Sequence, residues 1–182
     1  MIAIIIIAIV AILAAWFISV QRNLIKRDEF CKNALSQIGV QQASRWDALT
    51  ALAELTKSYN EHEYNTLRDI IAMRKKVTGN SSVKDVEEQE KMIETAMRSI
   101  DVVVEQYPQL KANETYLKTM DSVNVYENQV RTSRMVYNDN VTSFNRLIRQ
   151  IPSNFVANML HFTEREYLEV SQEKTEMPSM KI

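Results

Sequence analysis

The sequence predicts an all-α protein in which an N-terminal transmembrane helix is followed by an antiparallel bundle of long helices. Residues 2–20 form an apolar run with no charged residue, glycine or proline. The whole chain has only two glycines and three prolines, so it offers few turns and few helix breakers. Beyond residue 21, apolar side chains recur at spacings of three and four, which is typical of amphipathic helices.

The apolar run matches the thickness of a bilayer. At about 1.5 Å per residue it spans roughly 28 Å, against a hydrocarbon core of about 30 Å. The run follows Met1 directly, without a basic n-region, and is longer than the apolar region of a signal peptide, which favours an uncleaved anchor. We therefore expect the lipid bilayer to be bound through residues 2–20.

The charges that flank the run predict an orientation. Every charged side chain lies after residue 21, and the first basic ones are Arg22, Lys26, Arg27 and Lys32. Because basic residues stay on the cytoplasmic side, we expect the N-terminus outside the cell and the helical domain in the cytoplasm.

Four helices are predicted after the anchor. The first covers Arg22 to about Val77, with a bend near Gly39, and Gly79 in the following loop suits a helix C-cap. The second covers Val83–Gln106 and is stopped by Pro108. The third begins near Asn113, a candidate N-cap, and runs to Ile151. The fourth runs from Asn154 to about Leu168, with Ser153 as its candidate N-cap. Short connections then predict antiparallel packing, with residues 1–21 as the anchor, 22–170 as the bundle and 171–182 as a flexible tail.

The third helix has the most regular seam, and polar residues interrupt it. Glu127 and Arg134 stand at seam positions seven residues apart, and Arg74 interrupts the seam of the first helix. They form either a buried polar site for a ligand or, as we favour, a layer of ion pairs that fixes the helix register. Because an unpaired buried charge is costly, we expect these three residues to pair with one another or with Asn138. The seam reads Tyr116, Met120, Val123, Glu127, Val130, Arg134, Tyr137, Val141, Phe144, Ile148 and Ile151.

No residue pattern points to catalysis, a cofactor or nucleic acid. His62–Glu63 lacks the second histidine of a zinc-protease motif, because Thr66 stands in its place. A single cysteine, Cys31, excludes an intramolecular disulfide. The net charge of −1 gives no electrostatic basis for nucleic-acid binding. We therefore expect a protein that is not an enzyme and has no metal or cofactor.

Several segments resemble the LemA family. Residues 107–113 are similar to its motif Y-P-x-L-K-A-N, residues 59–67 to Y-x-x-H-E-x-x-T-L, and residues 133–152 to A-R-x-x-Y-N-x-x-V-x-x-Y-N-x-x-I-x-x-F-P. Departures occur at Leu35 and Gly39, where the family has Trp and Asp, and in 49–52, which lacks the usual proline. The first motif is carried by Tyr107, Pro108, Leu110, Lys111, Ala112 and Asn113.

The resemblance implies a helical bundle on an N-terminal anchor in a bacterial cell membrane, in a family for which no enzymatic activity or cofactor is established. Together with the long helices and regular seams, it leads us to expect a membrane-anchored scaffold or interaction protein that associates with itself or with a partner protein. A membrane-tethered sensor that switches between two helix packings is the alternative.

Overall fold

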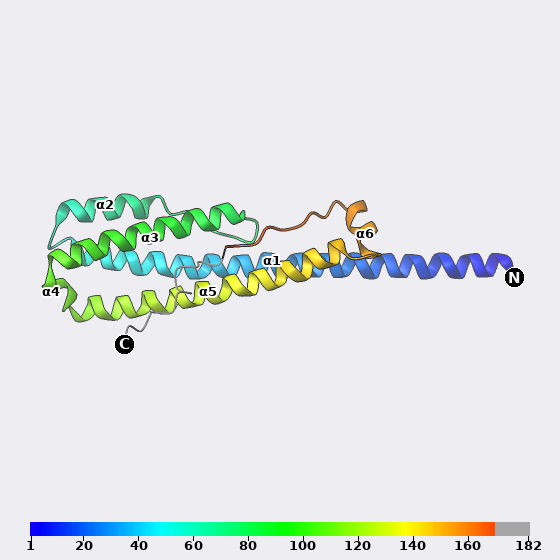
Figure 1. Ribbon diagram of the computed structural model, residues 1–182, viewed down its shortest axis with the longest axis horizontal. Coiled ribbons are helices and arrows are strands. Elements are labelled where there is room, and N and C mark those ends of the chain that lie inside the picture. Colours follow the sequence, from blue (N-terminus) through cyan, green and yellow to red (C-terminus); the bar gives the residue numbers. More distant parts are fainter. Residues whose placement is uncertain (170–182) are drawn as a thin grey trace, which may run out of the picture.

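The computed structural model describes residues 1–169 as an elongated all-α protein, so the predicted fold class is confirmed. Six helices follow one another, and no strand occurs in this part of the chain. Figure 1 shows them as an up-and-down bundle with the N-terminus projecting from one end. The predicted tail, 171–182, lies outside the described residues. The helices are α1 (Ile2–Thr56), α2 (Glu61–Ala72), α3 (Val83–Gln106), α4 (Pro108–Lys111), α5 (Glu114–Arg149) and α6 (Ser153–Met159).

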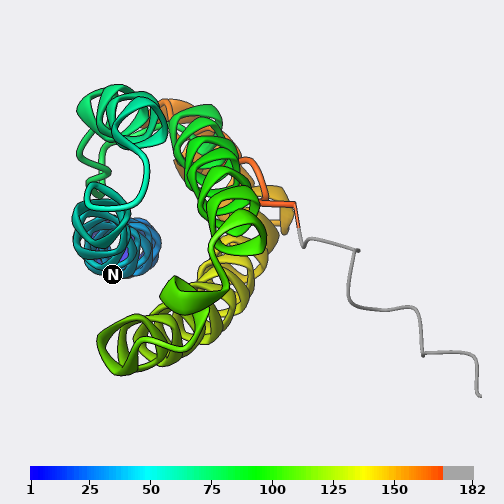
Figure 2. The ribbon, with the colours of Figure 1, turned by 90° about the vertical axis from the view of Figure 1, so that its left-hand side faces the viewer.

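Helix α1 runs for 55 residues, about 82 Å at roughly 1.5 Å per residue. Its N-terminal apolar part is exposed and is long enough to cross a membrane. The rest of the same helix continues into the bundle. In Figure 2, seen end-on, α2, α3 and α5 lie around α1, and each of the three contacts it.

The prediction of one helix from Arg22 to Val77 is wrong. The helix ends at Thr56, and residues 57–60 turn the chain back into α2. The Asn60 side chain caps α2 by accepting hydrogen bonds from the backbone N–H groups of His62 and Glu63 (3.1 and 3.2 Å). This turn contains neither glycine nor proline, so its signals in the sequence were the loss of apolar periodicity and Asn60 as an N-cap residue followed by acidic residues.

Residues 74–80 connect α2 to α3 without helical structure, and they pack closely on α1. A Cβ atom added to Gly39 would lie 2.2 Å from the carbonyl oxygen of Val77, and one added to Gly79 would lie 2.7 Å from that of Lys32. Both glycines therefore allow two backbones to approach each other. Gly39 lies within the continuous helix α1, and the expected C-cap role of Gly79 is wrong because Met73 caps α2.

The next elements follow the prediction closely. Helix α3 has the predicted bounds and begins with a capping box, in which Ser82 and Asp85 satisfy each other's backbone N–H groups. Asn113 caps α5 as expected. Between α3 and α5, Pro108 begins the short helix α4, where its missing N–H group leaves no donor unpaired.

The C-terminal part departs from the prediction. Only Ser153–Met159 is helical, and Pro152, not Ser153, is its N-cap residue. His161 has a positive φ of 57°, and the N–H of Phe162 binds the carbonyl oxygen of Ala157 (3.0 Å). This Schellman-type ending redirects the chain. Residues 162–169, here called the C-terminal segment, then return along the bundle without helical structure.

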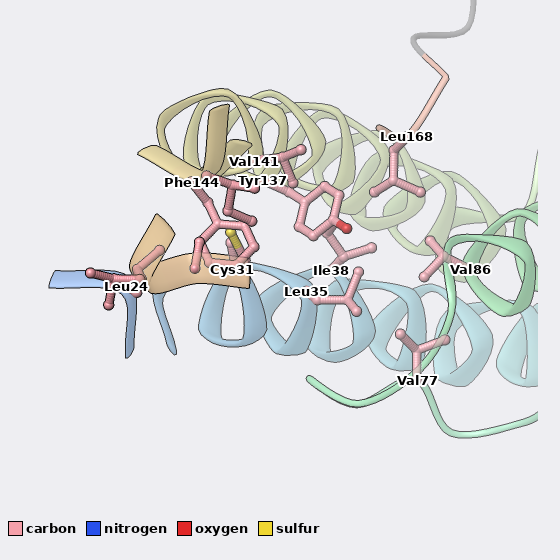
Figure 3. Packing of buried hydrophobic residues seen from close by; sticks show 14 residues of the cluster. Leu24, Cys31, Leu35, Ile38, Val77, Val86, Tyr137, Val141, Phe144 and Leu168 are labelled. Atoms are coloured by element: carbon pink, nitrogen blue, oxygen red, sulfur yellow. The ribbon is translucent and has the colours of Figure 1, made fainter. Parts of the chain in front are cut away.

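Buried apolar residues form two separate cores. The proximal core, nearer the anchor, joins α1, α5 and α6 with Val77, Val86 of α3 and Leu168, as Figure 3 shows. The distal core joins α1, α2, α3, α4 and the first turns of α5. Two different sets of elements therefore close the two ends of the bundle.

Candidate functional site: an asparagine clamp on the C-terminal segment

Two asparagines of α5 hold the backbone of the C-terminal segment. The Asn145 amide donates to the carbonyl oxygen of Arg165 and accepts from the N–H of the same residue, both at 2.9 Å. Asn138 does the same with Leu168, at 2.9 and 3.0 Å. Each side-chain amide thus replaces the partner that a neighbouring β-strand would offer. We call Asn138 and Asn145 the asparagine clamp.

The spacing of the clamp suits an extended chain. Asn138 and Asn145 are seven residues apart, which is about 10.5 Å along a helix. Arg165 and Leu168 are three residues apart, which is roughly 9–10 Å along an extended chain. The two repeats nearly coincide, so α5 can bind every third residue of a peptide that runs antiparallel to it.

Side chains of the segment fill three positions at the same spacing. Phe162 packs edge-on against Phe144, with ring centroids 6.1 Å apart. Arg165 reaches Asp28 of α1, and Leu168 is 2% exposed in the proximal core. Figure 3 shows Leu168 entering this core close to Tyr137. The clamp therefore combines recognition of the backbone with an apolar, a basic and another apolar position.

Further contacts tie the backbone of the segment to α5. The Tyr137 hydroxyl donates to the carbonyl oxygen of Glu166 (3.1 Å), and the Arg134 guanidinium donates to that of Glu169 (2.7 Å). Most of these contacts use backbone atoms of the segment, so they do not depend on its amino-acid sequence.

Asp28 of α1 binds the basic side chain of the C-terminal segment. Its carboxylate lies 2.7 Å from the Arg165 guanidinium and 2.8 Å from the Lys32 amine. Burial acts to raise the pKa of Asp28, but the hydrogen bonds from Lys32 and Arg165 outweigh it, and the pKa lies below its ordinary value of 3.8. Asp28 is therefore ionised at neutral pH and holds a basic side chain.

Cys31 and Tyr137 lie in the same core, and burial raises the pKa of both side chains. The Cys31 thiol is fully buried, so its reactive thiolate is disfavoured at neutral pH. The Tyr137 hydroxyl already serves as a donor to the segment. Both groups thus stabilise packing and offer no activated nucleophile.

The structure distributes the predicted polar layer differently. Arg74 is exposed and pairs with Asp47 of α1 (3.0 Å), so its expected place in a buried layer is wrong. Arg134 and Asn138 bind the C-terminal segment. Glu127 is partly buried on α5, between Val123 of the distal core and Val130.

A different polar contact lies between the two cores. The buried Gln42 amide of α1 donates to the Val86 carbonyl oxygen (3.2 Å) and to Glu90 of α3 (3.1 Å), and the buried Arg45 guanidinium also pairs with Glu90. We call Gln42, Arg45 and Glu90 the polar layer. Glu90 stands beside the buried Gln89 among the apolar positions of α3.

The residues of the first family motif build the corner between α3 and α5. The Tyr107 ring packs on Tyr59 (centroids 5.8 Å apart), Leu110 is buried in the distal core, and Asn113 caps α5. Pro108, Lys111 and Ala112 belong to α4 and its C-cap. The motif therefore maintains a turn far from the asparagine clamp.

Comparison with known proteins agrees with the resemblance seen in the sequence. The model of the LemA family matches residues 34–182. The chain belongs to the LemA family. Protein LemA of Metamycoplasma hominis is 29% identical to it over 142 residues, which cover 77% of this chain and 65% of that protein. The chain thus spans about 65% of the length of this LemA relative. The region matched by the family model contains the asparagine clamp and the distal core, but not Leu24 and Cys31 of the proximal core.

Proposed function

We propose that this LemA-family protein is a membrane-anchored, non-enzymatic interaction protein of the bacterial cell envelope, which binds an extended segment of another copy or of a partner protein. The observation that carries the proposal is the asparagine clamp. It shows that α5 recognises an extended backbone through paired amide hydrogen bonds. Proteins use such recognition to bind peptides of varied sequence.

The contacts of the clamp determine which residues a segment bound in its place must have. A competing segment needs an apolar residue, a basic residue and a second apolar residue at intervals of three, in the places of Phe162, Arg165 and Leu168. Asp28 selects the basic residue by its charge. The chain's own segment occupies the clamp in the monomer, so binding in trans is an exchange of one segment for another. The same segment of a second copy satisfies every requirement.

Two further features support the proposal. The exposed apolar part of α1 suits a membrane anchor, and the basic residues after it favour a cytoplasmic bundle. The groups with shifted pKa values near the clamp, Asp28, Cys31 and Tyr137, are engaged in structural contacts. This arrangement favours binding over catalysis.

A sensor is the second candidate, and the polar layer favours it. Gln42 Oε1, Arg45 Nε and the indole N–H of Trp46 are buried without a hydrogen-bond partner. Unsatisfied buried groups raise the free energy of one packing relative to another. Because α1 continues from the anchor to this layer without a break, a displacement in the membrane would reach it.

The sensor is tested by making the layer apolar. In a Gln42→Leu, Arg45→Met and Glu90→Leu variant, spin-label distances between α3 and α5 should narrow to one population where the native chain shows two. A native chain with a single narrow distance would reject the sensor.

Photo-crosslinking in living cells tests the interaction proposal. A benzophenone amino acid is placed at Thr142, which is exposed and lies beside Tyr167 of the segment (3.4 Å between hydroxyls), and separately at Lys57 and Lys84 as exposed positions away from the clamp. We expect adducts with a second copy or with one dominant protein at Thr142, and far fewer at the other two positions. Adducts within one chain only, together with a monomeric mass in detergent, would contradict the proposal.

A further inference from the structure

The corner at the proximal end of the bundle exposes an unusual apolar stripe. Ile151, Phe155 and Met159 have 73%, 67% and 67% of their surface exposed. Phe155 and Met159 are four residues apart and share one face of α6, and Ile151 is exposed in the turn just before this helix. The opposite face, with Ser153, Val156 and Ala157, is buried. Helix α6 thus has one face in the proximal core and one apolar face without a protein partner among the described residues.

This stripe lies at the level where the anchor ends. Phe17 and Val20 of α1 pack against the proximal core together with Leu160, and α6 contacts α1 directly. Figure 1 shows α6 beside α1 at the end of the bundle, beyond which α1 continues alone to the N-terminus. Both Phe17 and Val20 belong to the apolar run.

The length of the run fixes the depth of α6. Residues 2–20 span roughly 28 Å, and a bilayer core needs about 30 Å, so no turn of the run is left over. If the run crosses the bilayer, Phe17 and Val20 must lie within its last turn. The helix that packs beside them is then at the boundary between acyl chains and headgroups.

We propose that the exposed face of α6 binds the lipid bilayer, with Ile151, Phe155 and Met159 inserted at the boundary between headgroups and acyl chains. This inference rests on the proposed membrane anchoring. It gives the bundle a second contact with the membrane beside α1, as amphipathic interfacial helices do. Two contacts fix the tilt and rotation of the bundle, and so the direction in which the asparagine clamp faces.

The surrounding polarity fits the same depth. Asn158 is exposed on α6, and Arg22 and Lys26 are exposed on the first turns of α1 after the apolar run. Amide and basic side chains at this level suit the headgroup phosphates, while the three apolar side chains suit the acyl boundary. A lipid surface therefore satisfies both kinds of residue in one orientation.

The test measures the depth of spin labels on the full chain in vesicles of phosphatidylcholine with a minor fraction of phosphatidylglycerol. Labels are placed in Phe155→Cys and Met159→Cys variants. Ile9→Cys is the control for the anchor, and Val125→Cys, which is similarly exposed on α5 away from the proximal end, is the apolar control. The native chain, in which Cys31 is buried, shows the background.

We expect labels at 155 and 159 to collide severalfold more with oxygen than with a water-soluble nickel chelate, as at 9, and the label at 125 to show the reverse. Labels at 155 and 159 that behave like the one at 125, while 9 stays in lipid, would overturn this inference but keep the anchor. Labels shielded from both reagents would overturn it in favour of a protein contact. A label at 9 that meets the nickel chelate would instead contradict the proposed anchoring.

Discussion

The proximal and distal cores differ in the kind of chain that closes them. In the distal core, α1, α2 and α3 pack through apolar side chains, and α4 and α5 complete the end. In the proximal core, α1 and α5 form the long pair, and two non-helical stretches lie against it, 74–80 at Gly39 and 162–169 at the asparagine clamp. The proximal half therefore uses side-chain amides and close backbone contacts where the distal half uses helix seams.

The difference separates two roles. A core closed by helix seams depends on side-chain volume and gives a fixed body. A core closed by a clamped segment depends on a few hydrogen bonds, which another segment of similar form can replace. The polar layer of Gln42, Arg45 and Glu90 lies between the two and prevents one continuous apolar core. Local opening should therefore be easier at the clamp than in the distal half.

The largest expected effect comes from opening the clamp. Asn145→Ala leaves the partly buried N–H and carbonyl groups of Arg165 without their side-chain partner, which should cost about 2–4 kcal/mol of stability. Urea denaturation followed by circular dichroism measures this loss, and faster maleimide labelling of Cys31 reports the opening of the proximal core. Asn128→Ala is the matched control, because Asn128 is exposed on the same helix and should change stability by less than about 0.5 kcal/mol. Equal effects of the two variants would refute the special role of the clamp.

The second effect concerns the other non-helical stretch. Gly39→Ala should gain about 1 kcal/mol in helix propensity. The added Cβ would, however, lie 2.2 Å from the Val77 carbonyl oxygen, and the displaced backbone should make the net change destabilising by roughly 1–3 kcal/mol. Thermal denaturation shows whether the net change in stability is a loss or a gain, and Val40→Ala is the neighbouring exposed control. A more stable Gly39→Ala variant would show that 74–80 is not held against α1.

The third effect is a pH dependence of the clamp. The folded pKa of Asp28 is lowered, so its contribution is present above the unfolded value of 3.8 and is lost as the pH falls through the lower folded value. At neutral pH, Asp28→Asn should cost about 1–2 kcal/mol, and the difference from the native chain should shrink below about pH 4. Denaturation at several pH values measures it. Asp69→Asn, at an exposed ion pair, serves as control, and a difference that stays constant with pH would contradict the role of Asp28.

The smallest effect is at the turn into the C-terminal segment. His161 adopts a left-handed conformation that glycine favours, so His161→Gly should stabilise the protein by about 0.5–1 kcal/mol. The melting temperature measures this gain. Thr163→Gly, just beyond the turn, should not stabilise. A loss of stability in His161→Gly would mean that the imidazole makes a contact more valuable than the relief of backbone strain.

Periodicity predicted α3 and α5 closely, but not the end of α1, the short length of α6 or the non-helical segments. The seam of α5 and the start of α3 were predicted because apolar residues recur there at spacings of three and four. Arg134 was predicted as a polar residue of that seam and Asn138 as a possible partner for it, whereas both side chains bind the C-terminal segment. Their partners could not be found, because the C-terminal segment has no periodicity and lies about 30 residues further along the chain.

Asn145 was missed as part of the site, although the sequence held a signal for it. It stands seven residues after Asn138, so two amides share one face of a helix at a constant interval. In this structure the two asparagines at this spacing bind an extended chain. The end of α1 at Thr56 was missed for a simpler reason: the turn that follows is stabilised by Asn60 and has no helix-breaking residue.

Hydrogen exchange at four consecutive amides tests the central claim, that α5 binds an extended segment by its backbone. The N–H groups of Arg165 and Leu168 donate to the clamp, whereas those of Glu166 and Tyr167 have no acceptor among the described residues. Nuclear magnetic resonance of the full chain in detergent should therefore show slow exchange at 165 and 168 and fast exchange at 166 and 167, with protection lost in Asn145→Ala. Fast exchange at all four amides in the native chain would show that the segment is not clamped and would remove the basis of the proposed function.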